Sequence, residues 1–191
     1  MNVVDTLNIN LWAAPGVGKS TVAAQLFSSF KMSELSCELV REYAKDLMWD
    51  GKLAEHEQLW VTAEQHRRQS MVQGQVDVCI TDSALPLGYL YAPHGYRDDL
   101  LSIVRKLSSE WLQLDVLLTR DIMVDYQPLG RAQDVEQACA LQEDVMELFS
   151  RPIEGRGERI IVPVECAGDL IVAKAREMIA LKARNTTGLR F

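Results

Sequence analysis

The residues best suited to chemistry are the glycines, the lysine and the hydroxyl groups of GVGKST, positions 16–21. In a loop of this composition, successive backbone N–H groups can point into one concavity that holds a phosphate, and a helix that starts there adds the positive end of its dipole. Lys19 would reach the β- and γ-phosphates of a nucleotide, and the Ser20 hydroxyl would bind Mg²⁺, a hard cation that prefers oxygen ligands. The predicted nucleotide-binding residues are Pro15, Gly16, Val17, Gly18, Lys19, Ser20 and Thr21.

One position departs from the usual phosphate-binding pattern G-x-x-x-x-G-K-[ST], because Ala13 stands where the first glycine is expected. Alanine at a positive φ would cost on the order of 1 kcal/mol. The phosphate cradle is made mainly by residues 15–20, which are intact. We therefore predict that Ala13 has a negative φ and that phosphate binding is retained.

Asp82 is the candidate for a second metal-organising group. It follows the apolar run VDVCIT, positions 76–81. An acidic residue at the carboxyl end of a strand beside the glycine loop is where Mg²⁺ needs a further partner. The alternative is an aspartate that caps a helix or stabilises a turn.

Arg41 and Glu42 follow another apolar run, CELV, positions 37–40. The carboxyl ends of parallel strands form the ligand crevice of such folds, so both side chains could face the molecule that accepts the phosphoryl group. Glu42 would then take the hydroxyl proton or hold this acceptor, and Arg41 would bind an anionic part of it. The alternative is an exposed charge pair at the start of a helix.

An arginine that closes over the phosphates is expected in DYQPLGRAQD, positions 125–134. A mobile loop that brings Arg131 over the transferring phosphate would exclude water and neutralise charge. Arg120, which ends the preceding strand, is the alternative for this role and a candidate nucleotide contact. Gln65 and Arg68 could read a base or ribose from a helical segment, or that helix could simply present a solvated polar face.

Alternating strands and helices must position these residues. Period-two and continuous apolar runs predict strands at 7–12, 37–40, 76–81, 115–119 and 159–164. Helical spacing predicts helices at 18–30, 55–72, 100–112, 135–149 and 169–183. This alternation predicts an α/β fold with a doubly wound, five-stranded parallel sheet. We expect a single domain over residues 1–184 and a loosely held C-terminal tail, 185–191.

Composition narrows the classes of function. The 191 residues include 48% hydrophobic and 25% charged residues, as in ordinary globular domains. An 18-residue apolar run and a signal-peptide pattern are both missing, so we expect no membrane partner. The four cysteines are widely spaced, which favours buried free thiols over a zinc site or disulfides. The net charge of -7 disfavours indiscriminate nucleic-acid binding, although a local basic groove could be formed by Arg67, Arg68, Arg151, Arg156 and Arg159.

Together the motifs resemble the P-loop nucleoside- and nucleotide-kinase-like proteins, a group that includes the nicotinamide riboside kinase-type AAA domain and small phage-encoded P-loop kinases. The resemblance is carried by APGVGKST, by REYA at 41–44, by TDS at 81–83 and by the Y-x-x-x-G-R-x-Q run at 126–133. It extends from about Leu7 to Ile179. It implies a kinase core with the strand order 2-3-1-4-5, ATP and Mg²⁺ as cofactors, and a cytoplasmic location in a bacterium or a phage-infected host.

The resemblance also assigns roles to single residues. Phosphate binding falls to residues 16–21, a metal or base role to Asp82, acceptor binding to Arg41 and Glu42, and the role of lid to Arg131. Three functions remain open: transfer of the γ-phosphoryl group of ATP to a small nucleoside- or nucleotide-like acceptor, phosphorylation of a hydroxymethyl pyrimidine within DNA, and ATP binding or hydrolysis without an acceptor. The net negative charge counts against DNA as the substrate. Both a monomer and a homodimer are compatible with the sequence.

Overall fold

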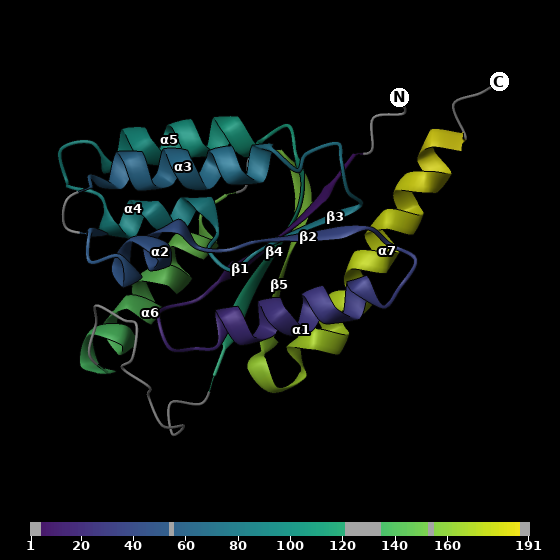
Figure 1. Cartoon of the computed structure of the whole chain (residues 1–191), viewed down its shortest axis with the longest axis horizontal. Helices are drawn as coiled ribbons and strands as arrows, with labels where there is room; N and C mark the ends of the chain where they lie inside the picture. The colour runs from purple at the N-terminus through teal and green to yellow at the C-terminus, as the bar shows by residue number, and fades with distance from the viewer. Residues whose placement is uncertain (1–4, 54–55, 121–134, 153–154, 188–191) are drawn as a thin grey trace.

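The sheet is the centre of the molecule. The structure is a computed structural model that describes residues 5–53, 56–120, 135–152 and 155–187, with the side chains of 135–139 and 183–187 outside the description. The strands are β1 (Leu7–Trp12), β2 (Cys37–Val40), β3 (Val78–Thr81), β4 (Leu112–Thr119) and β5 (Arg156–Pro163). They pair in parallel in the order β2-β3-β1-β4-β5 (Figure 1). The predicted α/β fold and strand order are confirmed.

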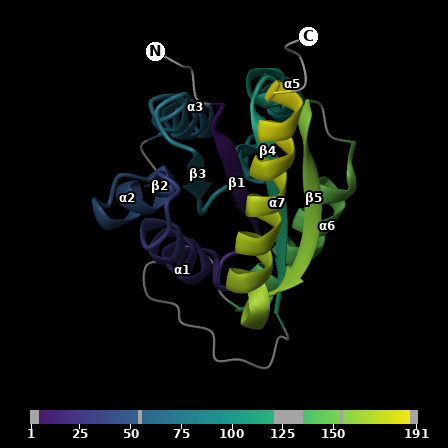
Figure 2. The same cartoon turned by 90° about the vertical axis from the view of Figure 1, so that its right-hand side faces the viewer.

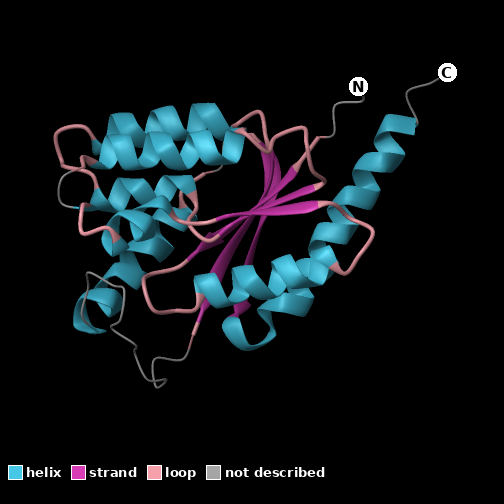
Figure 3. Cartoon of the chain, in the orientation of Figure 1, coloured by secondary structure: helices cyan, strands magenta, loops and turns pink. Residues whose placement is uncertain are grey.

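Helices cover both faces of this sheet (Figure 3). The described α-helices are α1 (Lys19–Lys31), α2 (Tyr43–Trp49), α3 (Gln58–Ser70), α4 (Gly88–Tyr91), α5 (Arg97–Ser108), α6 (Val135–Ser150) and α7 (Ala167–Thr187). Two short 3₁₀ turns, η2 (Leu85–Leu87) and η3 (Val164–Cys166), precede α4 and α7. Figure 2 shows α7 running along the sheet on the side that carries α1, with α5 and α6 behind. None of the described helices is long and apolar enough to cross a membrane.

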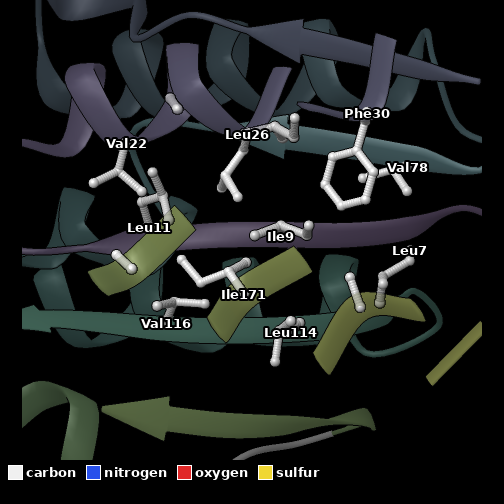
Figure 4. Packing of buried hydrophobic residues seen from close by; sticks show 14 of the residues in the cluster. Leu7, Ile9, Leu11, Val22, Leu26, Phe30, Val78, Leu114, Val116 and Ile171 are labelled. Atoms are coloured by element: carbon white, nitrogen blue, oxygen red, sulfur yellow. The ribbon is translucent and has the colours of Figure 1, made fainter. Parts of the chain in front are cut away.

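The main core lies between the sheet and the α1–α7 layer. The odd-numbered residues of β1, Leu7, Ile9 and Leu11, are fully buried and pack against Leu26 of α1 and Ile171 of α7 (Figure 4). Successive strand residues point to opposite faces, so the alternation LNINL directs the leucine and isoleucine side chains to this core. This packing fixes the direction in which β1 enters the glycine loop.

On the other face of β1, Asn10 belongs to a buried polar cluster. Asn10 donates to Asp115 Oδ1 at 2.8 Å and to Gln113 Oε1 at 3.2 Å. Arg159 of β5 pairs with Asp115 at 3.5 Å and donates to the backbone carbonyls of Phe149 and Arg151 at the end of α6. Buried polar groups need such partners. The cluster therefore connects three strands to the end of α6.

Several element boundaries differ from the sequence-based prediction. The helix predicted over 100–112 ends at Ser108, because Leu112 pairs with Leu7 of β1 and Arg156 of β5 as the start of β4. The last helix continues to Thr187, four residues beyond the predicted end. Burial of the thiols is confirmed for Cys37 and Cys79, and desolvation raises the pKa of Cys79 to about 12. Cys166 is exposed, so the prediction was wrong there.

Candidate active site

The glycine loop joins β1 to α1 and has the backbone that phosphate binding requires. Gly16 has φ 94° and Gly18, the N-cap of α1, has φ 119°. Among the described residues no side-chain-bearing residue has a positive φ, so the prediction for the backbone of Ala13 is confirmed. A Cβ atom on Gly18 would lie 3.2 Å from Val164 Cγ1, so the loop packs closely against η3. Both the φ angle and the available space therefore favour glycine at position 18.

Three side chains, those of Lys19, Arg120 and Gln142, form hydrogen bonds with the backbone of this loop and of the residues that lead into it. Lys19 Nζ donates to the carbonyls of Ala13 at 2.6 Å and Ala14 at 3.1 Å. Arg120 Nη1 donates to Gly16 O at 3.3 Å, so this predicted nucleotide contact does lie at the loop. From α6, Gln142 accepts a hydrogen bond from Ala14 N at 2.7 Å and donates to Leu118 O at 3.3 Å. The sequence did not single out Gln142, because a lone glutamine on a helix carries no pattern.

Asp82 lies where β3 ends, next to β1, and its two carboxylate oxygens have separate partners. Ser20 Oγ donates to Oδ2 at 3.0 Å, and the backbone N–H of Glu42 donates to Oδ1 at 2.6 Å. Asp82 is only 4% exposed. The alternative of a helix cap does not describe this geometry, since the N-cap of the following η2 is Ala84 and no side chain caps that turn.

The Ser20 hydroxyl and the Asp82 carboxylate fit the ligands that Mg²⁺ prefers. This ion is usually held by one or two protein oxygens together with water and substrate phosphates. Within the described ranges no group of three or more His, Cys, Asp or Glu side chains could hold a metal ion. A magnesium ion at this place would therefore depend on the phosphates of a bound nucleotide for further ligands.

Glu42, which follows β2, has a carboxyl group whose pKa is shifted by its surroundings. Burial raises the pKa of its carboxyl group, and the positive charge of Lys19 opposes this effect. Removing a carboxylate from water disfavours its charged form. A carboxylate with a raised pKa is a better proton acceptor, so Glu42 is suited to take a proton from a hydroxyl group.

A cavity of about 720 Å³ connects the glycine loop with Glu42, and Asp82 is not among the residues that line it. At one end it is lined by the glycine loop with Lys19 and Ser20, and Glu42 lines it as well. The other walls come from α2, α3, η2 and α4 and from the segments that follow α2 and α4. They combine polar side chains, such as Gln58 and Thr62 of α3, with apolar ones. The apolar lining residues include Leu53, Val61, Leu85, Leu87, Tyr91 and Tyr96. This volume is typical of sites for small organic ligands.

Most of the predicted nucleotide-binding residues line this cavity. They are Pro15, Gly16, Gly18, Lys19, Ser20 and Thr21, whereas Val17 packs against the core. Gln65 also lines it, but its amide already accepts from Tyr43 N at 2.8 Å and donates to Thr81 Oγ1 at 3.3 Å. Gln65 therefore holds α2 to β3 beside the cavity. Its contact with an acceptor stays a prediction.

Arg41 and Arg68 do not line the cavity. Arg41 pairs with Asp46 at 3.1 Å, and Arg68 pairs with Asp46 at 2.7 Å and with Glu64 at 3.1 Å. The Arg68 guanidinium also lies over the Tyr43 ring at 4.5 Å. The roles of both arginines in acceptor binding stay predictions, and Arg131 lies outside the described residues.

The cavity contains one cation that the sequence did not single out. Lys45 lies on α2 three residues after Glu42, lines the cavity, and has its Nζ 3.5 Å from Ser20 Oγ. Residues three apart share a helix face, so this position could have been found once α2 was recognised. The sequence-based prediction considered a helix that starts at Arg41 and Glu42 only as an alternative and gave it no bounds, whereas the structure has α2 with Glu42 as its N-cap.

The arginines that could have formed a basic groove are instead paired with carboxylates. Arg67 pairs with Glu64 and Arg156 with Asp5. The other three pairs are Arg68 with Asp46, Arg151 with Glu147 and Arg159 with Asp115. These partners reduce the positive charge that each arginine could offer to a nucleic acid.

Comparison with known proteins decides the family. The family model described as AAA domain matches residues 8–161, which is more than half of the chain. The chain belongs to the AAA domain family. No curated protein sequence gives a match. Among solved structures, the AAA domain is similar to deoxyadenosine kinase from M. mycoides with the products dCMP and a flexible dCDP bound. The TM-score is 0.51 and the sequence identity is 13%. The similarity covers 90% of this chain and 99% of the kinase chain.

At this identity the structural similarity shows a shared fold. The AAA domain thus has the P-loop fold of a deoxynucleoside kinase, and the family resemblance drawn from its motifs is confirmed. The glycine loop, β1 from Asn8 onward and most of β5 fall inside the matched range 8–161. The assignment of individual site residues does not follow from this similarity and rests on the geometry above.

Proposed function

We propose that this AAA domain is a Mg²⁺-dependent kinase that transfers the γ-phosphoryl group of ATP to a nucleoside- or nucleotide-like acceptor. The observation that carries this proposal is the continuous cavity that begins at the phosphate loop, is lined by Glu42 and extends to a partly polar wall on α3 and an apolar wall on η2 and α4. A protein that only binds ATP has no need of a carboxylate beside such a space. The size and lining of the cavity fit a second organic molecule.

The donor side is built by the residues around the start of α1. Backbone N–H groups of the loop and the α1 dipole would hold the phosphates, with Lys19 as the charged partner. Ser20 and Asp82 would hold Mg²⁺, which when bound would neutralise phosphate charge. The bond from Gln142 to Ala14 N keeps the entry to this loop in place.

On the acceptor side, Glu42 favours a hydroxyl group over a phosphate group. The acceptor oxygen would bond to phosphorus as its proton moves to the Glu42 carboxylate and ADP leaves with the electrons of the broken P–O bond. An anionic phosphate acceptor would be repelled by the same carboxylate. Arg41 and Arg68, which could offset this repulsion, are paired with Asp46. Lys19 and Lys45, which line the cavity, have their ammonium groups at the phosphate loop, on the donor side.

These charges favour a free nucleoside as the acceptor. The deoxyadenosine kinase of similar fold has dCMP bound as a product, which is consistent with a nucleoside substrate in a cavity of this architecture. A hydroxymethyl pyrimidine within DNA also offers a neutral hydroxyl group. It is disfavoured because the candidate arginines for a nucleic-acid groove already have carboxylate partners.

The test is an assay of ATP consumption and of phosphorylated product, with Mg²⁺ and a panel of nucleosides, nucleoside monophosphates and hydroxymethylated DNA. We expect a nucleoside to be converted to its monophosphate, with Lys19→Ala as the inactive control. Conversion of the DNA alone would identify the polymer-directed kinase. ATP binding without phosphorylated product from any acceptor would contradict the kinase proposal.

A further inference from the structure

We propose that Lys45 binds the terminal phosphate of the donor nucleotide and stabilises the phosphoryl group during its transfer. This inference rests on the proposed kinase function and adds a second lysine to the phosphate site. It assigns to α2 a direct part in the reaction. Neither the glycine-loop motif nor the family match assigns a role to this residue.

The position of Lys45 follows from the way α2 begins. Glu42 is the N-cap of α2, and its backbone N–H is held by Asp82 Oδ1 at 2.6 Å. One turn later, Lys45 shares the helix face of Glu42 and lines the same cavity. Its Nζ lies 3.5 Å from Ser20 Oγ, which itself donates to Asp82. The ammonium group is therefore placed at the part of the loop where the last phosphate of a nucleotide is expected.

The charges around α2 single out Lys45. The neighbouring cations are paired: Arg41 and Arg68 with Asp46, and Lys52 with Asp50 at 2.7 Å. Lys45 forms no ion pair within 4.0 Å among the residues that the structure describes. Asp46 is the next residue in the chain, yet its oxygens are taken by the two arginines. The ammonium group donates to the neutral Ser20 hydroxyl, and the Glu42 carboxylate lies near enough to interact with its charge. Because no ion pair within the described residues holds it, this half-buried group can offer its charge to an anion bound beside it.

The positive charge of the Lys45 ammonium group can stabilise the transition state of phosphoryl transfer. In the transition state the negative charge is spread over the three equatorial oxygens of the transferred group. The P–O bond to ADP breaks, the bond to the acceptor oxygen forms, and the acceptor proton goes to Glu42. Lys45 interacts with the equatorial oxygens and takes no part in the proton transfer. Its contribution should therefore depend on the γ-phosphate, which ATP carries and ADP lacks.

The experiment compares the binding of ADP and of a non-hydrolysable ATP analogue, each with Mg²⁺, by isothermal titration calorimetry. For Lys45→Ala we expect the Kd of the ATP analogue to rise by about tenfold and that of ADP to change by less than about twofold, because one charge-assisted hydrogen bond to the γ-phosphate is lost. Lys45→Arg should recover part of the loss. The matched control is Lys52→Ala, since Lys52 lies close in sequence, is exposed, and does not line the cavity.

The outcomes separate this inference from the proposed function. Equal changes in the Kd of ADP and of the ATP analogue, or no change in either, would overturn the role of Lys45. Thermal unfolding of each variant identifies a loss that comes from misfolding, and Lys45→Gln then serves as the milder substitution. If the unmodified protein binds the analogue and discriminates it through Lys45 but phosphorylates no acceptor, the kinase function fails and the phosphate contact stands.

Discussion

Glu42 is the residue on which the proposed reaction depends most directly. Glu42→Gln keeps the size of the side chain but removes its ability to accept a proton. We expect kcat to fall by about 10²- to 10⁴-fold, the usual contribution of a general base. The Kd of ATP should change little, because the carboxylate does not belong to the phosphate loop. Steady-state kinetics together with ATP titration check both quantities.

A control for this substitution is Glu38→Gln, which alters an exposed carboxylate that pairs with Lys31 at 3.9 Å. Its kcat should match that of the unmodified protein. A Glu42→Gln protein with full kcat would show that the acceptor proton leaves by another route. Asp82 would then be the remaining described carboxylate at the phosphate loop.

Glu64 gives the protein a measurable pH dependence of stability. Hydrogen bonds from Arg67 lower the pKa of Glu64 to about 2, compared with 4.5 for a free glutamate, and Arg68 adds to the effect. Because the folded-state pKa is the lower one, the stabilisation is present above pH 4.5 and is lost as the pH falls toward 2. Glu64→Gln should therefore reduce the free energy of unfolding by about 1 kcal/mol at pH 7, a value discounted for the exposed Arg67.

Urea unfolding at pH 7 and at pH 3.5 measures this difference. The gap between Glu64→Gln and the unmodified protein should narrow at the lower pH. Glu143→Gln, on the exposed face of α6, is the control and should show no gap at either pH. A gap of the same size at both pH values would mean that Glu64 stabilises the fold through packing rather than charge.

At the scale of elements, α6 positions the phosphate loop through one side chain. Gln142 bonds both to Ala14 N and to Leu118 O, so it connects the end of β4 with the entry to the loop. Gln142→Ala leaves two backbone groups without these partners, which costs about 1–3 kcal/mol of stability. We also expect weaker ATP binding, by about three- to tenfold, because the loop backbone loses a fixed contact.

Chemical unfolding and ATP titration of Gln142→Ala test both parts of this prediction. Glu143→Ala changes the neighbouring, exposed residue of the same helix and should leave both quantities unchanged. Stability loss without any change in the Kd of ATP would limit Gln142 to a structural role.

The elements also show how far the sequence could predict the site. The strands and the glycine loop were predictable because β1 alternates apolar and polar residues in LNINL and GVGKST follows a few residues after the strand ends. The short helices α2 and α4 were not, since seven and four residues are too few for a clear helical period. Lys45 was missed for this reason. The positions of the Arg41 and Arg68 side chains depend on their contacts with Asp46. The contact between Arg68 and Asp46 joins residues 22 positions apart, so it leaves no local pattern in the sequence.

At the scale of the whole molecule, nucleotide and metal should stabilise the fold together. The loop, α1, β3 and the start of α2 meet at Ser20, Asp82 and Glu42, so a ligand that bridges them binds the folded state alone. At a concentration 100 times its Kd, an ATP analogue with Mg²⁺ should add about 2.7 kcal/mol, which corresponds to a rise in Tm of about 5–10 °C for a chain of this size. Differential scanning fluorimetry measures this rise.

Removal of the metal separates the contributions of the two ligands. With EDTA we expect most of the rise in Tm to disappear, because the phosphates then lose the cation that links them to Ser20 and Asp82. In Ser20→Ala the response to Mg²⁺ should shrink, while the Tm of the ligand-free protein should stay close to that of the unmodified chain. Ser20 is exposed, and its hydroxyl makes one bond to Asp82 and one long contact with Lys45. An EDTA-resistant rise in Tm would mean that Lys19, Lys45 and the loop amides neutralise the phosphates without a metal ion. The magnesium part of the proposal would then be wrong, whereas the nucleotide site itself would stand.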